Sequence, residues 1–185
     1  VVARDTSITA INNNGFISGI STQNNVLVNN VIINAKAGGS ALVIGIESYG
    51  GNITVENNSV INSTGFDATL GLSSGGSILF GDSTLNVITS SESFMYGIYA
   101  ETDLTVTNST MNFTSTGSAR NLGIDVGGDI TATGLTLQAT GAADVYALTS
   151  RSGRIAATNS DIAARSTSNM ANNTVYALYA ATSAT

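Results

Sequence analysis

Apolar residues alternate with polar or small residues along most of this chain. Leu104 and Val106 alternate with threonines, and Met111 and Phe113 repeat the pattern after Asn108. A period of two sends successive side chains to opposite faces of a strand, whereas an amphipathic helix repeats near 3.6 residues. The pattern therefore predicts a succession of short β-strands rather than helices.

The strand pattern recurs about every 26 residues. The stretch "MYGIYAETDLTVTNSTMNF" (95–113) returns 26 residues later as "NLGIDVGGDITATGLTLQA" (121–139). Small residues form one column: Gly19, Gly45, Gly71, Gly97, Gly123, Ala147 and Ala177. A second column consists of Asp5, Asn30, Asn57, Asp82, Asn108, Gly134 and Asn159. Because these residue types tolerate a left-handed backbone, the second column predicts one tight turn in every repeat.

Each repeat has room for three short strands, and stacked repeats can pair every strand with its counterpart one coil on. We therefore predict an all-β, right-handed parallel β-helix (solenoid) of about seven coils, with about 26 residues and three strands per coil. Residues 1–185 are expected to be a single β-helix domain and a fragment of a longer solenoid. Two interior ladders are predicted: Ile33, Val60, Leu85, Met111, Leu137 and Ile162; and Val26, Ile53, Ile78, Leu104, Ile130 and Ile155.

The first strand of each coil carries the small-residue column. If the apolar pair Ile44/Ile46 and its counterparts face the interior, with Tyr96, Tyr146 and Tyr176 in the same ladder as Ile44, the glycines face outward. They would then form a shallow trough of exposed backbone that seats an extended polymer such as a glycan. The candidate ligand-binding residues are Gly45, Glu47, Gly71, Ser73, Gly97, Tyr99, Gly123, Asp125, Thr149 and Tyr179. The alternative is that the glycines only allow a bend or close packing against a neighbouring segment.

Composition narrows the possible chemistry. Only 10% of the residues are charged, and the chain has no His, Cys, Trp or Pro. The usual zinc ligands, thiol nucleophiles and commonest general base are therefore missing, and we assign no catalytic residue and no cofactor. Asp103 and Asp129 are expected to stack on adjacent coils, but a solvated corner beside Arg154 explains them better than calcium binding, so no metal site is predicted.

Charge and hydropathy exclude two classes of partner. The formal net charge is −6 and the six basic residues are scattered, which disfavours binding to a phosphate backbone. The longest apolar run, "ALVIGI" (41–46), is far too short to span a bilayer. We predict neither nucleic-acid binding nor membrane insertion of this segment.

The chain resembles the right-handed β-helical passenger domains of bacterial autotransporter adhesins, the pertactin-like and pectin-lyase-like group. The resemblance lies in repeat sequences such as "YGIYAETDLTVTNSTMNF" and "NLGIDVGGDITATGLTLQA" and in the asparagines at the turns. The resemblance covers essentially the whole chain. It implies export across the bacterial envelope, display at the cell surface, and binding to host extracellular matrix proteins, to glycans or to a second copy of the chain. It carries over no active-site residue.

Three functions follow as hypotheses: an adhesive binding rod, a structural stalk, and a polysaccharide-acting lyase or hydrolase. In the predicted trough Glu47 and Asp125 lie three coils apart, roughly 14 Å, which is too far for the two carboxylates of a glycosidase. The spacing disfavours an enzyme, and the resemblance to autotransporter adhesins makes adhesion the preferred hypothesis. For an enzyme, Asp125 and Asp129 are the first residues to consider.

Overall fold

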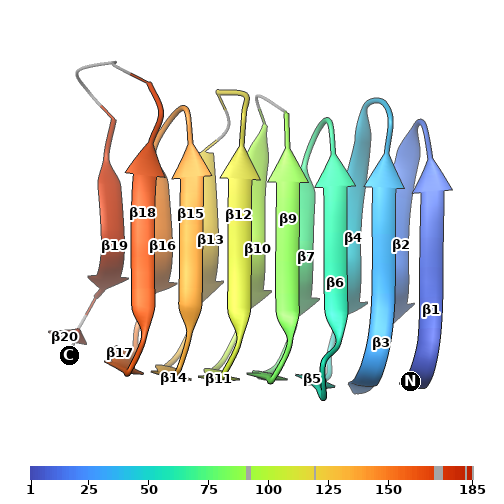
Figure 1. The fold of residues 1–185 in the computed structure, drawn as a ribbon, viewed down its shortest axis with the longest axis horizontal. Coiled ribbons are helices and arrows are strands. Elements are labelled where there is room, and N and C mark those ends of the chain that lie inside the picture. Colours follow the sequence, from blue (N-terminus) through green and yellow to red (C-terminus); the bar gives the residue numbers. More distant parts are fainter. Residues whose placement is uncertain (91–92, 119, 169–172, 182, 185) are drawn as a thin grey trace.

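The chain forms a stack of coils in which every strand pairs in parallel with the coils before and after it. The computed structural model describes all residues except 91–92, 119, 169–172, 182 and 185, and the described residues form twenty strands (Figure 1). The predicted parallel β-solenoid with three strands per coil is confirmed. Within the described part of the chain, no helix could serve as a membrane span.

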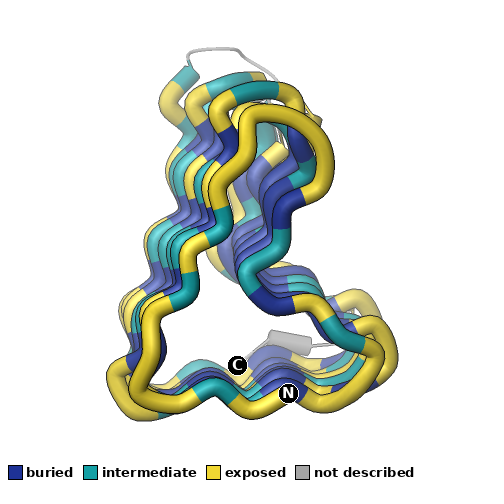
Figure 2. Tube along the Cα trace, turned by 90° about the vertical axis from the view of Figure 1, so that its right-hand side faces the viewer, coloured by how far each residue is buried: buried dark blue, intermediate teal, exposed yellow. Residues whose placement is uncertain are grey.

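Two sheets build the three sides of the coil, which is seen end-on in Figure 2. The seven-stranded sheet lies at the back of Figure 1 and contains β2 (Gly15–Thr22), β4 (Ala41–Ser48), β7 (Thr69–Ser74), β10 (Phe94–Ala100), β13 (Arg120–Val126), β16 (Val145–Ser150) and β19 (Val175–Ala180).

The thirteen-stranded sheet bends around a corner and forms the other two sides. Its front limb in Figure 1 holds β6 (Val60–Gly65), β9 (Thr84–Thr89), β12 (Thr110–Ser115), β15 (Thr136–Gly141) and β18 (Asp161–Ser166). Its lower limb holds β5 (Ile53–Glu56), β8 (Ile78–Gly81), β11 (Leu104–Thr107), β14 (Ile130–Thr133), β17 (Arg154–Thr158) and β20 (Ser183–Ala184). The long strands β1 (Val2–Asn12) and β3 (Val26–Ala37) pair with each other, and β3 continues through both limbs.

The corner between these limbs is the predicted left-handed turn. Positive φ angles occur at Asp5 (47°), Asn30 (53°), Asn57 (56°), Asp82 (47°), Asn108 (44°), Gly134 (65°) and Asn159 (51°). Some of the side chains also bond along the axis, as where Asn30 Nδ2 donates to Asp5 Oδ1 at 2.8 Å. Every member of the predicted turn column is therefore confirmed.

The interior ladder that begins at Val26 is confirmed by the strand register through Ile155. The other ladder needs one correction, because Ile61 rather than Val60 pairs with Ile33 and Leu85 and is fully buried. The physical reason is a second left-handed residue, Asn58 (φ 59°), which adds one residue to that turn. Each buried aliphatic side chain contributes about 1.5–3 kcal/mol, so these ladders dominate stability.

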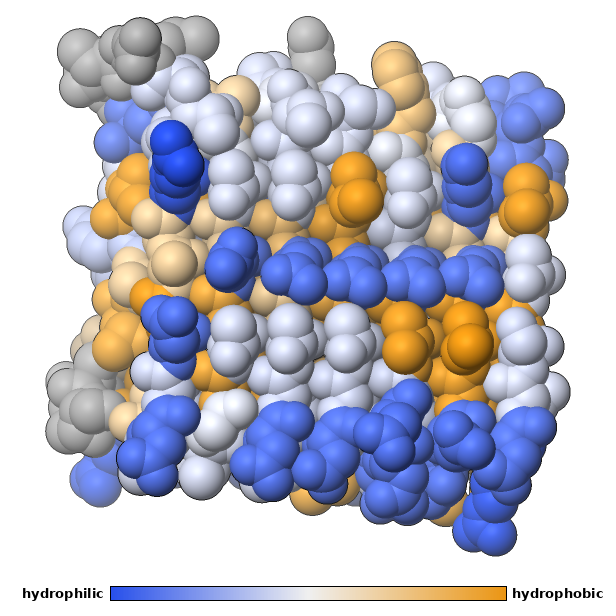
Figure 3. Space-filling view, in the orientation of Figure 1, coloured by the Kyte–Doolittle hydropathy of each residue, from blue (hydrophilic) through white to orange (hydrophobic). Residues whose placement is uncertain are grey.

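The outer face of the front limb carries a row of amides across the coils (Figure 3). Asn62 Nδ2 donates to Asn34 Oδ1 at 2.8 Å, and Asn86 Nδ2 donates to Asn62 Oδ1 at 2.9 Å. Asn112 Nδ2 continues the row by donating to Asn86 Oδ1 at 3.0 Å. The exposed side of this sheet is therefore tied together by side chains as well as by backbone.

Leu104→Asp is expected to lower the free energy of unfolding by about 4 kcal/mol or more, because it buries a charge in a packed ladder. Thermal melts followed by circular dichroism check this. Thr107→Asp, on the exposed side of the same strand, is the matched control and should melt close to the parent. Equal melting of the two variants would contradict the register.

At the turn, Asn108→Val should cost about 1–2 kcal/mol more than Asn108→Gly, because a β-branched residue resists a positive φ. Both variants lose the 3.3 Å hydrogen bond from Asn108 Nδ2 to Asp82 Oδ1, so their difference isolates the backbone effect. Urea denaturation of the two proteins measures it.

Candidate functional site

A groove runs along the outer face of the seven-stranded sheet, parallel to the axis of the solenoid. It consists of two hollows of about 500 and about 310 Å³ that share Tyr96 as a lining residue. Its floor row consists of Ile44, Leu70, Tyr96, Leu122, Tyr146 and Tyr176. Its edge row consists of Glu47, Ser73, Tyr99, Asp125, Thr149 and Tyr179.

The glycine column does not line this groove, and its predicted outward orientation is wrong. A Cβ added at Gly97 would overlap the ring of Phe113 and the carbonyl oxygen of Gly123, so this position faces the core. The other candidate glycines also face inward against side chains or backbone: Gly45, Gly71 and Gly123. The alternative reading of the column, close packing, is the one that the structure supports.

The reason is a kink in the first strand of every coil. Tyr96 pairs with Leu122 and Ile98 pairs with Ile124, but the ladder skips the glycine between them. Gly97 and Ile98 both face the interior, where Ile98 is fully buried in the core cluster. Two successive inward residues break the period of two, so Tyr96 and the rest of the floor row point outward instead of inward.

The six predicted residues of the edge row do lie together. Tyr99 pairs with Ser73 on one side and Asp125 on the other. Thr149 pairs with Asp125 and with Tyr179. The row is therefore continuous, with one residue per coil at the strand spacing of about 4.8 Å.

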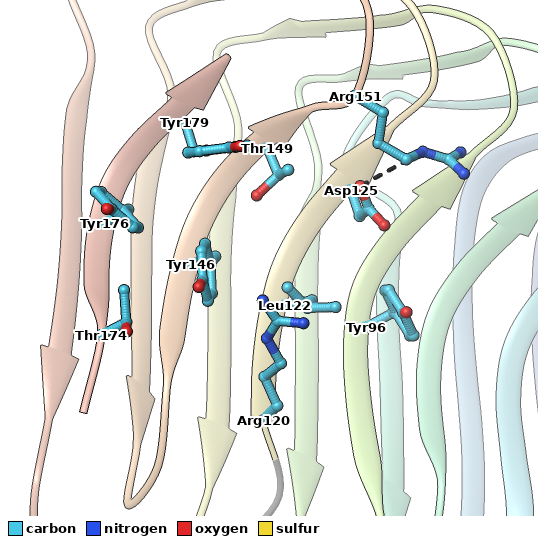
Figure 4. A pocket seen from close by; sticks show the side chains of 10 residues that line it. All are labelled: Tyr96, Arg120, Leu122, Asp125, Tyr146, Thr149, Arg151, Thr174, Tyr176 and Tyr179. Carbon is cyan, nitrogen blue, oxygen red and sulfur yellow. Dashed lines mark ion pairs between the residues drawn. The ribbon is translucent and has the colours of Figure 1, made fainter. Parts of the chain in front are cut away.

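Aromatic rings gather in two groups on either side of β13. On β10, the centroids of Tyr96 and Tyr99 lie 5.7 Å apart. On β16 and β19, Tyr146 lies 5.4 Å from Tyr176 and 6.3 Å from Tyr179, centroid to centroid. Figure 4 shows Asp125 and Leu122, both on β13, between these groups.

Arg151 enters the groove from the turn after β16. Its guanidinium lies 4.8 Å from the ring centroid of Tyr99, and its Nη1 donates to the Tyr99 hydroxyl at 3.2 Å. It also forms ion pairs at 3.6 Å with Glu101 and with Asp125. The sequence analysis did not assign this residue to the site, because the candidate residues were taken from strand positions only. The one sequence signal for it was the basic turn "SRSGR", which follows the edge-row residue Thr149.

The floor has a second cation at its margin. The Arg120 guanidinium carbon lies 4.5 Å from the ring centroid of Tyr146. This contact adds a second positive charge to the lining of the larger hollow.

Asp125 and Thr149 are each only 8% exposed, and each has a polar atom without a hydrogen bond, as do Ser63, Thr69 and Asn121 in the interior. In the groove these atoms are Asp125 Oδ1, whose nearest charge is Arg151, and Thr149 Oγ1. Burial raises the pKa of the Asp125 carboxyl, and the positive charges of Arg151 and Arg120 offset part of that rise. A buried polar atom without a partner costs about 1–3 kcal/mol, so this pair is destabilising as it stands.

Asp103 and Asp129 belong to the fold rather than to the groove. Asp103 Oδ1 accepts a hydrogen bond from the Asp129 backbone N–H at 2.8 Å, and Asp129 Oδ1 accepts one from the Arg154 backbone N–H at 2.8 Å. Each side chain thus ties one coil to the next. Across the described residues, no three metal-ligating side chains of His, Cys, Asp or Glu converge.

Comparison with known proteins gives no assignment: no family model, no curated protein and no solved structure matches the chain.

Gly97→Ala is expected to lower the free energy of unfolding by about 3 kcal/mol, since its methyl group has to displace a core ring and a neighbouring backbone carbonyl. Gly50→Ala, at an exposed turn where the new Cβ would lie 3.3 Å from the Gln23 carbonyl oxygen, is the milder control. Chemical denaturation compares the two. If the two variants were equally stable, Gly97 would face outward, as the sequence pattern predicted.

Asp125→Asn should be more stable than the parent at neutral pH and equal to it in strong acid. A raised pKa in the folded state means that the parent loses stability as the pH rises from the ordinary aspartate range through the folded-state pKa. The variant lacks this loss, so the advantage should appear across that window and persist above it. Melting temperatures from pH 3 to 8 measure it, and a variant less stable than the parent at pH 7 would contradict the cost assigned to the buried carboxylate.

Proposed function

We propose that this chain is a segment of a secreted bacterial surface adhesin, and that the groove on the seven-stranded sheet is its binding surface. The ligand is an extended one: a host matrix protein, a glycan or a second copy of the chain. The solenoid fold and the repeat sequences that resemble autotransporter passengers support an adhesin function and display outside the cell.

The observation that carries the proposal is the tyrosine-lined groove, whose larger hollow is also lined by Arg151, Asp125 and Thr149. Tyrosine rings give a large contact area and carry a hydroxyl that can hydrogen-bond, so they are enriched at binding surfaces.

A groove is also the right shape for an extended ligand. The floor row supplies apolar and aromatic contact area, and the edge row supplies polar groups at a constant spacing along the axis. A compact ligand would use only one of the two hollows, whereas a chain-like ligand can occupy both.

The test is binding of the purified chain to a panel of immobilised fibronectin, laminin, collagen, glycosaminoglycans, neutral glycans and the chain itself. We expect saturable binding to at least one member, and Tyr179→Ala should weaken it about tenfold, because aromatic contacts often dominate such surfaces. Thr136→Ala, on the exposed face of the opposite sheet, is the control and should bind like the parent.

Absence of binding across the panel, with a cooperative melt, would instead favour the structural stalk. Binding that Tyr179→Ala leaves unchanged would move the adhesive surface away from the groove. Release of oligosaccharides from a polysaccharide, abolished by Asp125→Asn, would indicate the enzymatic alternative.

A further inference from the structure

The aromatic rings of the groove form two groups that are separated along the solenoid axis. In each group the rings contact one another at centroid distances between 5.4 and 6.3 Å, so each group presents a surface that is already in place. The first aromatic group consists of Phe94, Tyr96 and Tyr99, all on β10. The second aromatic group consists of Tyr146 on β16 and Tyr176 and Tyr179 on β19.

The floor row sets the distance between the two groups. In the order of the sheet, β13 lies between β10 and β16, so Tyr96 and Tyr146 stand in the same row two coils apart. Two coils at the usual strand spacing amount to about 9.6 Å. Between the two tyrosines lies Leu122, as Figure 4 shows, and its side chain is shorter than theirs.

This distance matches the repeat of a polyproline II helix. Such a chain has three residues per turn and a rise of about 3.1 Å, so residues three apart lie on the same face about 9.3 Å apart. An α-helix returns to the same face after seven residues, or about 10.5 Å, which fits less closely. Prolines three residues apart can therefore contact one aromatic group each.

A polyproline II chain also suits the face of a sheet. The backbone groups of β13 are already paired with β10 and β16, so this face offers side chains only. A polyproline II backbone needs no strand partner, and its free carbonyls can accept hydrogen bonds from tyrosine hydroxyls. Proline-rich segments characteristically dock in aromatic-lined grooves. The rings of Tyr176 and Tyr179 are accessible for this, since the residues are 43% and 45% exposed.

Charge favours an acidic residue between the two prolines. Within the described residues, both ion pairs are made by Arg151, whose charge is balanced by Glu101 and Asp125. Arg120 is in neither pair, although its guanidinium carbon lies 4.5 Å from the ring centroid of Tyr146. It stands on β13, the coil between the two aromatic groups, where a carboxylate of a partner can pair with it.

Resting on the proposed function of the groove, we infer that its larger hollow binds a proline-rich segment of another protein in the polyproline II conformation. The segment lies along the solenoid axis. One proline contacts the first aromatic group, the proline three residues on contacts the second, and an acidic residue between them pairs with Arg120. The 185 residues contain no proline, so a second copy of them does not supply this segment.

The experiment is titration of the full chain into a fluorescein-labelled peptide of four Pro-Ala-Glu repeats, followed by fluorescence anisotropy. A scrambled peptide of the same composition, in which no two prolines are three residues apart, tests the spacing. A peptide of four Pro-Ala-Lys repeats tests the charge. Physiological ionic strength screens the net charge of −6. We expect saturable binding of the Pro-Ala-Glu peptide and binding of the other two that is weaker by about fivefold or more.

Variants of the two aromatic groups and of Arg120 locate the contacts. Tyr146→Ala should weaken binding of the Pro-Ala-Glu peptide about tenfold, down to the level of the scrambled peptide, because one aromatic group is lost. Tyr146→Phe keeps the ring and should retain the preference for regular spacing. Arg120→Gln should remove the preference for glutamate over lysine and leave the spacing preference intact.

Phe66→Ala is the matched control, because Phe66 is an aromatic residue that is 54% exposed at a turn outside the groove. It should bind all three peptides like the parent. Melting curves establish that each variant is folded before its affinity is compared.

Equal affinity of the parent for the regular and scrambled peptides, or binding of neither, would overturn the inference. So would a spacing preference that survives in folded Tyr146→Ala. The broader proposal fails separately: if a panel member binds through Tyr179 and no proline peptide does, the groove remains an adhesive surface and the polyproline II assignment is wrong. If nothing binds in either experiment, both fail.

Discussion

Backbone pairing between successive coils is the constraint on which the whole molecule depends. Since each strand bonds in parallel to its counterpart about 26 residues away, each paired strand residue is held directly above an equivalent one. Side chains are therefore selected as columns, and a column has to suit the interior, the surface or a corner along its full length. The ladders, the turn asparagines and the two rows of the groove are all products of this single requirement.

The sequence predicted most of these columns because their signals are local. A turn that needs a positive φ leaves Asn, Asp or Gly at one position in every repeat, and alternation identifies the strands of the bent sheet. The one-residue shift at Val60 was not predicted, because Asn57 alone accounts for a turn. Nothing in the sequence pattern distinguishes a turn with two left-handed residues from a turn with a single left-handed residue. The coil count and the parallel stacking did not depend on that detail.

The candidate site was harder to predict because it lies where the period of two fails. Extrapolation from Ile46 through Gly45 placed Ile44 inside, but the chain kinks at the glycine and sends two neighbours into the core. The orientation of the edge row was nevertheless predicted correctly, because this row lies after the kink and its orientation was inferred from the neighbouring ladder of Ile46, which does face the interior. Arg151 was missed for a different reason. Its contacts with the groove are made by a long side chain that reaches back from a turn across two coils, and a repeat pattern in the sequence does not reveal such contacts.

The extra residue at Asn58 shows how this architecture absorbs change. The turn takes up the additional residue within one corner, and the strands on either side resume the same pairing with the coils above and below. A corner can therefore be lengthened without moving the neighbouring columns. Changes in the length of a corner are thereby uncoupled from the packing of the core, so such a molecule can alter what it presents to its surroundings one coil at a time while its interior stays in place.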